Sequence, residues 1–380
     1  MDILPYSDNH HAFRMKLREF LSSEVTPYVG QWESDHIVPK AIWKKMGQEG
    51  FLCTTVSREY GGLSGDFLYS VIVIEEMVKT NHTGLMVQLH SDIVVPYIES
   101  FGTEIQKRRY LPGCVTGDIV MAVAMTEPNS GSDLASMTST AVEEEDQVVI
   151  NGAKTFISNG INCDLVVLAV KDPSVDNPHK AVSLYLIEAD TPGFKKGNRL
   201  EKLGMYSQDT AELFFTNCRI SKDQLLGKKG QGFIQLMQKL QQERLVCVIW
   251  ALAIAKNILS WTEDYCRNNP KFGKPLAASQ SVQFSLVEML TEVRIGTTFV
   301  HQLVINHMQR KERVIDTSMA KYWISDMANR VANRCLSMVG NIGMSETCPV
   351  VRMWRDIRVF SIFAGTSEIM KSIIAKSKAF

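Results

Sequence analysis

The sequence is short of the features that mark several protein classes. None of its eight cysteines forms a CxxC pair or stands at zinc-ligand spacing from a histidine, so we expect neither a disulfide framework nor a zinc site. Lysine plus arginine and aspartate plus glutamate both number 41, which leaves no net charge to attract nucleic acid or an anionic membrane. The longest apolar run, residues 245–255, is well below the roughly 18 residues that predict a transmembrane helix.

Common nucleotide-binding and targeting signals are missing too. No GxGxxG follows a predicted strand, and neither GxxxxGK[ST] nor HExxH occurs, so nothing supports a Rossmann, P-loop or zinc-protease site. Residues 1–20 contain acids and histidines without a continuous apolar stretch, which predicts no secretory or transit peptide. We therefore expect a cytoplasmic protein, unless the chain is the mature form of an imported one.

The hydrophobic pattern divides the chain into three parts. From residue 12 to about 115, apolar residues recur at helical spacing. From about 118 to 215, short β-branched and aromatic segments between turn residues indicate antiparallel strands, and Asn151-Gly152 is the best hairpin candidate. Helical periodicity returns from about 233 and continues to the end. This predicts an α+β multidomain fold: an α-helical domain at 1–118, a β domain at 119–227 and a second helical domain at 228–380.

A single carboxylate interrupts the apolar face of the first long helix after the strands. Positions 236, 240, 243, 247, 250 and 254 share this face, and all except Glu243 are apolar or cysteine. Burial would raise the pKa of Glu243 toward the working range of a general base. On the residues alone, a structural ion pair between Glu243 and a neighbouring Arg or Lys is the favoured explanation, because such pairs perturb pKa values as well. Asp92, a second acid among apolar residues, fits a helix N-cap better than chemistry.

The polar segment 126–133 (TEPNSGSD) directly follows the first predicted strand. It carries three hydroxyl side chains, and Pro128 and Gly131 keep its backbone out of regular pairing. Such a loop suits a polar cofactor lying across the end of a strand. By composition alone it is also an ordinary connecting loop.

Seven segments, in order, resemble the acyl-CoA dehydrogenase family along essentially the whole chain. They are residues 58–62 (REYGG), 124–133 (AMTEPNSGSD), 151–160 (NGAKTFISNG), 209–215 (DTAELFF), 230–233 (GQGF), 272–276 (FGKPL) and 364–369 (AGTSEI). The resemblance implies N-terminal helices, a middle β domain and a C-terminal four-helix-bundle-like domain. It also implies FAD as cofactor, an acyl-CoA substrate, electron-transferring flavoprotein as electron acceptor, and a homodimer or homotetramer.

The resemblance further implies which residues contact FAD. In the middle domain, Thr126, Gly131 and Ser132 would contact the flavin ring and pyrophosphate, while Phe156 and Ser158 would lie against the isoalloxazine. Phe272 and Gln280 would contact the FAD of a neighbouring subunit. The full set is Met125, Thr126, Gly131, Ser132, Phe156, Ser158, Phe272, Gln280, Thr366 and Glu368.

The resemblance also directs attention to Glu243 as the base. Many family members carry a catalytic carboxylate directly before the C-terminal Gly-Thr-Ser, where this chain has Ala364, which cannot accept a proton. In the long-chain and isovaleryl branches the base lies in a Glu-Arg-Leu sequence, which matches residues 243–245. Glu243 would then remove the α proton as hydride passes from the β carbon to flavin N5, with Arg244 supporting it from the adjacent position.

Two other readings remain open at this stage. Asp92 is an alternative proton acceptor in a same-fold flavoprotein that reacts with oxygen, or that acts on carrier-bound or cyclic acyl thioesters. Asn269, Ser337 and Asn341 depart from the family pattern on the adenine side of FAD, where loss of an Arg removes a charge-assisted phosphate contact. These departures motivate a third reading, a relative that binds acyl thioesters but holds little FAD.

Overall fold

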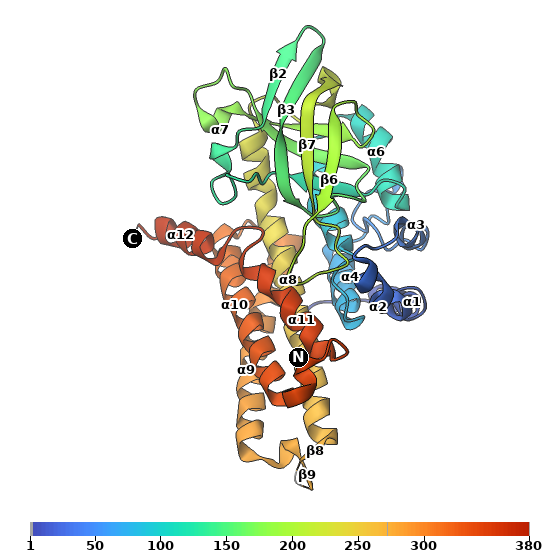
Figure 1. The fold of residues 1–380 in the computed structure, drawn as a ribbon, viewed down its shortest axis with the longest axis vertical. Helices are drawn as coiled ribbons and strands as arrows, with labels where there is room; N and C mark the ends of the chain where they lie inside the picture. Colours follow the sequence, from blue (N-terminus) through green and yellow to red (C-terminus); the bar gives the residue numbers. More distant parts are fainter. Residues whose placement is uncertain (1–2, 272, 380) are drawn as a thin grey trace.

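The computed structural model describes residues 3–271 and 273–379. The sheet lies at one end of a bundle of long C-terminal helices, and the N-terminal helices pack beside both (Figure 1). The N-terminal helices are α1 (Asp8–Glu24), α2 (Val29–Asp35), α3 (Lys40–Gln48), α4 (Phe67–Lys79), α5 (Val95–Phe101) and α6 (Glu104–Thr116).

Local capping explains where the N-terminal helices begin. Asp66 caps α4 by accepting a hydrogen bond from the Leu68 N–H at 2.9 Å. Thr103 and Gln106 form a reciprocal capping box at the start of α6. The segment Leu89–Val94 is a π-helix that runs directly into α5, an irregularity that is frequent at functional sites.

The middle domain is mainly antiparallel, as predicted, with one correction. Its strands are β1 (Met121–Ala124), β2 (Thr140–Glu144), β3 (Gln147–Ile157), β4 (Leu165–Lys171), β5 (Val182–Glu188), β6 (Phe194–Arg199) and β7 (Ala211–Ser221), with the short helix α7 (Pro178–Ala181) before β5. In the order β1-β4-β2-β3-β7-β6, with β5 on β4, both β1 and β2 pair with β4 in parallel. Neither pair is joined by a tight turn, which would make it antiparallel, because β3 lies between these strands and β4 in the chain.

The hairpin predicted at Asn151-Gly152 is wrong. These residues lie inside β3, which continues through them, and the turn between β2 and β3 instead falls at 145–146. Gly152 has φ +150°, and the register with β7 shifts between Ile150 and Gly152. A Cβ at Gly152 would stand 2.2 Å from the Ser139 hydroxyl. The glycine therefore serves a β-bulge with a close neighbour rather than a turn.

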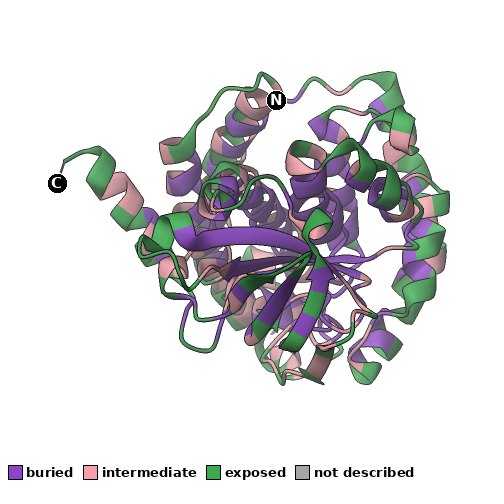
Figure 2. Ribbon diagram, turned by 90° about the horizontal axis from the view of Figure 1, so that it is seen from above, coloured by how far each residue is buried: buried purple, intermediate pink, exposed green. Residues whose placement is uncertain are grey.

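Strands β4 and β5 are buried on both faces of the sheet, whereas β7 alternates between buried and exposed residues. Along β4, Leu165, Val167 and Ala169 join a core shared with the helices, while Val166, Leu168 and Val170 join a second core within the sheet. This alternation follows from the two-residue period of a strand. Figure 2 shows strands in which buried and exposed residues alternate, and a more exposed C-terminal helix, α12, that projects from the body.

The C-terminal domain consists of long helices. They are α8 (Gly232–Asn268), α9 (Gln280–Met308), α10 (Val314–Val339), α11 (Pro349–Ile357) and α12 (Ser367–Ser377), and a small hairpin of β8 (Pro270–Lys271) and β9 (Lys274–Pro275) joins α8 to α9. By length and composition α8 could cross a membrane, but 78% of its most apolar window is buried inside the protein. This burial is typical of a core helix. All eight cysteines are buried and free.

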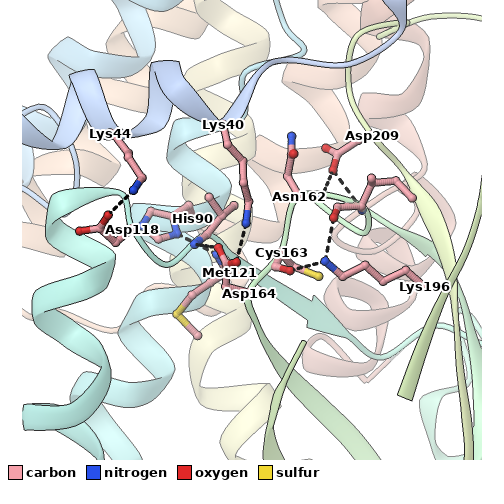
Figure 3. Close-up of polar contacts among 12 residues, drawn as sticks. Lys40, Lys44, His90, Asp118, Met121, Asn162, Cys163, Asp164, Lys196 and Asp209 are labelled. Atoms are coloured by element: carbon pink, nitrogen blue, oxygen red, sulfur yellow. Dashed lines mark hydrogen bonds and ion pairs between the residues drawn. The ribbon is translucent and has the colours of Figure 1, made fainter. Parts of the chain in front are cut away.

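Polar contacts fix the N-terminal helices to the edge of the sheet (Figure 3). Asp164 accepts the Val120 N–H at 2.9 Å and pairs with Lys40 of α3. Burial lowers the pKa of His90 to about 4, so its ring is neutral. The ring accepts the Met121 N–H at Nδ1 (3.1 Å) and donates from Nε2 to the Cys114 carbonyl (3.0 Å). These bonds set the position of β1 and of the loop after it.

Candidate functional site

A buried ion pair holds the loop that follows β1. Lys154 Nζ of β3 lies 2.7 Å from Glu127 Oε1, and these side chains are 0% and 2% exposed. The Glu127 carboxylate also accepts hydrogen bonds from the Thr138 and Ser139 backbone N–H groups. Burial alone would raise the pKa of Glu127, but Lys154 and these hydrogen bonds lower it to about 2. The ionised carboxylate therefore closes the segment 127–139 into a fixed loop.

The end of β3 presents an aromatic ring in an uncommon backbone conformation. Phe156 has φ +57°, and its side chain is 66% exposed. The register with β7 shifts between Lys154 and Ile157, so Phe156 stands at an irregularity of the strand. A left-handed backbone at a bulky residue costs of order 1–3 kcal/mol in conformational free energy, and residues in this conformation are concentrated at functional sites.

The α8 carboxylate is buried without a cation. Glu243 is 4% exposed, and its Oε1 accepts a hydrogen bond from the Tyr97 phenol of α5 at 2.7 Å. No other hydrogen bond or ion pair to this carboxylate occurs among residues 3–271 and 273–379. Burial raises the pKa of Glu243 to about 7, although the Tyr97 hydrogen bond and the charges of Arg244 and Lys239 oppose the rise.

A charged residue on α10 holds the loop before α12. Lys321 is 0% exposed, and its ammonium donates to the carbonyls of Phe360 (2.7 Å) and Gly365 (2.6 Å). Ala364 and Gly365 both have positive φ, so the loop turns sharply between these anchors. Thr366 then caps α12 by accepting the Ile369 N–H at 3.1 Å. Burial lowers the pKa of Lys321 to about 8.

These segments surround one cavity of about 490 Å³ between the three parts of the chain. Its apolar lining comes from the π-helix region, α8 and α12, and includes Leu89, Ile93, Leu240, Trp250 and Ile369. Its polar lining includes Glu243 and Arg244. Arg244 is only 7% exposed, and its Nε is buried without a hydrogen-bond partner in the described part of the chain. The cavity thus offers an apolar space, a carboxylate without an ion-pair partner and a guanidinium whose Nε has no described partner.

The structure brings most of the predicted site residues to this cavity. Those that line it are Met125, Thr126, Gly131, Ser132, Phe156, Ser158, Glu243 and Arg244. Asp92 does not line it: the carboxyl accepts a hydrogen bond from Ser70 at 2.6 Å. The N-cap interpretation of Asp92 is also wrong, because the residue lies within the π-helix Leu89–Val94.

The remaining predicted residues lie elsewhere. Gln280 is the exposed first residue of α9, at the far end of the bundle beside β8 and β9 (Figure 1). Thr366 and Glu368 lie at the start of α12, next to cavity residues but outside the lining itself. Phe272 lies outside the described residues.

Sequence reasoning missed Tyr97 and Lys321. Tyr97 belongs to the apolar run 93–98, and no neighbouring residue in that run indicates that its hydroxyl has a polar partner. Lys321 does carry a signal: positions 317, 321, 324, 328, 331 and 335 share one face of α10, and all six residues are buried. A lone charge on an apolar helix face therefore marks Lys321 just as it marks Glu243.

Three family models match successive parts of the chain. The acyl-CoA dehydrogenase N-terminal, middle and C-terminal domain models match residues 7–118, 122–218 and 230–379. The long-chain specific acyl-CoA dehydrogenase of Rattus norvegicus is 39% identical, over 98% of this chain and 86% of that protein. The isovaleryl-CoA dehydrogenase of Oryza sativa is 32% identical, over 98% and 92%. The crystal structure of an acyl-CoA dehydrogenase from Geobacillus kaustophilus is 48% identical, covers 99% of both chains and has a TM-score of 0.97.

Proposed function

Because this chain belongs to the acyl-CoA dehydrogenase family, we propose that it oxidises an acyl-CoA thioester to the 2-enoyl-CoA with Glu243 as the base that removes the α proton. The chain is an oxidoreductase acting on a CH–CH group, and FAD is its cofactor. The observation that carries the assignment is the buried Glu243 carboxylate, which lines the cavity without a cationic partner. Ala364, which lines the same cavity, has no group that could accept the proton.

The described residues fit FAD. Phe156 presents an exposed ring to the cavity from a strained backbone, and the hydroxyl residues Thr126, Ser132 and Ser158 line the same space. The unpartnered Nε of Arg244 is a buried donor that a polar ligand can satisfy. When bound, FAD supplies the acceptor for the hydride that leaves the β carbon.

The protein's own residues then handle the proton. A carboxylate whose pKa is about 7 is largely ionised above neutral pH and still basic enough to accept a proton from carbon. The apolar lining raises the proton affinity of the carboxylate, which keeps it basic enough for the α proton near neutral pH. Arg244, the next residue on α8, is buried and lines the same cavity, so its positive charge would act there in a low effective dielectric.

We further propose an electron-transferring flavoprotein as the electron acceptor, a cytoplasmic location and a homodimer or homotetramer. The assembly is supported by α9, which exposes Phe284 (59%), Val287 (59%) and Leu290 (42%) within two turns. Apolar side chains in such a row favour a protein–protein contact.

Replacement of Glu243 by glutamine tests the proposal. We expect E243Q to bind FAD normally but to bleach the flavin about 10²–10⁴-fold more slowly when acyl-CoA is added without oxygen, because an amide cannot accept the proton. A panel of straight, branched and cyclic acyl-CoAs identifies the substrate class in the same assay. E263Q is the matched control, since Glu263 lies on the same helix about 30 Å further along. Bleaching by E243Q at the native rate would refute Glu243 as the base.

A further inference from the structure

A tyrosine outside the cavity contacts the proposed base. Tyr97 of α5 is fully buried, and its hydroxyl donates to Glu243 Oε1 at 2.7 Å. Tyr97 is not among the residues that line the cavity, whereas Glu243 is. The phenol therefore reaches the carboxylate from behind. One carboxylate oxygen is engaged by the protein, and the other remains for the substrate.

We propose that Tyr97 is the positioning residue for Glu243: its hydrogen bond fixes one oxygen, aims the other at the substrate α carbon and favours the ionised carboxylate in the resting enzyme. This inference rests on the proposed function. A hydrogen bond from a phenol to a charged acceptor is stronger than one between neutral groups, so it opposes protonation of Glu243. It also restricts the side-chain torsions of Glu243, which orients the base before the substrate binds.

The hydrogen bond is compatible with the whole proton transfer. In the step, the C–H bond at the α carbon breaks, its electron pair becomes the α–β double bond as hydride leaves the β carbon for the cofactor, and the proton binds the free oxygen, Oε2. The Tyr97 O–H still donates to Oε1, which becomes the carbonyl oxygen of a neutral carboxylic acid. No rearrangement of the protein is needed, because Oε1 is an acceptor in both states.

Few other groups face the Glu243 carboxylate. Lys239 and Arg244 of α8 lower its pKa through their charges, and Cys247 lies one turn further along the same helix. From the neighbouring elements, Asp92 of the π-helix directs its carboxyl to Ser70. The loop before α12 contributes Ala364 and Gly365, which do not titrate. Among residues 3–271 and 273–379, the one direct hydrogen bond to this carboxylate comes from Tyr97, so its loss should change the pKa of Glu243 directly.

The pH dependence of kcat/KM for Tyr97→Phe tests this inference. Loss of the hydrogen bond to the ionised form should move the acidic limb upward by about 1–2 pH units. At pH 6 the rate should then fall at least about tenfold, while above pH 9 it should stay within about threefold of the native rate. Tyr110→Phe is the matched control, because the buried Tyr110 donates to Glu188 at 2.7 Å, away from the cavity.

The outcomes separate this inference from the proposed function. If E243Q is inactive and Y97F keeps the native limb, the Tyr97 inference is wrong and the base assignment stands. If E243Q keeps native activity, the proposed function itself is wrong. An equal loss for Y97F at every pH, with normal FAD content, would also contradict the inference, since a purely structural role lowers the rate without moving the limb. Flavin absorbance per protein shows that each variant is folded.

Discussion

The buried pair Lys154–Glu127 allows a prediction whose magnitude follows from burial. Both side chains are at most 2% exposed, and the Glu127 carboxylate takes four hydrogen bonds, one of them from Lys154. Lys154→Met removes the cation and leaves the carboxylate buried. Breaking such a pair from one side destabilises a protein by about 3–5 kcal/mol, because the remaining charge has lost its compensation. We expect a loss of that size in the free energy of unfolding, measured by urea denaturation.

The loss should also reach the cofactor, because the pair closes the loop that carries Thr126 and Ser132. K154M should therefore release FAD more readily on gel filtration. Lys44→Met is the matched control: Lys44 pairs with Asp118 at the same 2.7 Å, but these side chains are 57% and 56% exposed. Exposed pairs contribute little. Equal unfolding midpoints for K154M and K44M would refute the reasoning from burial.

Three further predictions use other contacts. Gly152→Ala should lower the free energy of unfolding by more than about 1 kcal/mol in urea, because its Cβ would meet the Ser139 hydroxyl at 2.2 Å and the site has φ +150°. Lys321→Met should leave two carbonyls, including Gly365, without a donor and lower FAD occupancy in absorbance spectra. Native kcat/KM should fall about tenfold per pH unit below about pH 7, where Glu243, with its raised pKa, becomes protonated. A flat profile down to pH 5 would contradict this last prediction.

The pKa of Glu127 is shifted in the opposite direction from that of Glu243, and this shift makes stability depend on pH. Its pKa in the folded protein is about 2, below the ordinary value of 4.5, so the folded state favours the ionised form. The stabilisation is complete above about pH 4.5 and is lost as the pH falls toward 2. K154M lacks the cation that lowers this pKa, so the native protein's advantage over K154M in free energy of unfolding, measured by tryptophan fluorescence in urea, should shrink as the pH falls from 4.5 toward 2.

The succession of helices, strands and helices could be predicted because hydrophobic period is a local property. The apolar face of α8 is an example: Leu236, Glu243, Trp250 and the other positions on that face are all buried. The role of Gly152 could not be predicted in the same way, because a hairpin and a β-bulge both favour Asn-Gly. The close approach of Ser139, which distinguishes them, depends on strand pairing between distant segments.

The candidate site shows the same division between local and distant information. The loop 126–133 and Glu243 have signals within their own segments, so they could be named before the fold was known. The hydrogen bond from Tyr97 to Glu243 joins residues 146 positions apart, and the position of Tyr97 behind the cavity follows only from the packing of α5 on α8. Asp92 has a similar local pattern to Glu243, yet its carboxyl turns toward Ser70. Side-chain direction, which the sequence does not encode locally, separates the two acids.

Three buried glutamates show why Glu243 differs from a structural acid. Glu76 contacts Arg14, Arg18 and Lys79, and burial is outweighed there by these cations, which lower the pKa to about 2. Glu127 reaches the same value through Lys154. Glu243 is equally buried, but a phenol replaces the cation, and its pKa rises to about 7.

A raised pKa alone does not identify the base, because burial also raises the pKa of Asp92 to about 7 and that of Asp356 to about 6. Asp356 accepts the Met205 N–H at 2.6 Å and the Thr83 hydroxyl, and neither aspartate lines the cavity. A base must meet its substrate as well as hold the right proton affinity. Among the described acids with a pKa raised to about 6 or 7, Glu243 meets both conditions, and geometry rather than titration therefore decides the assignment.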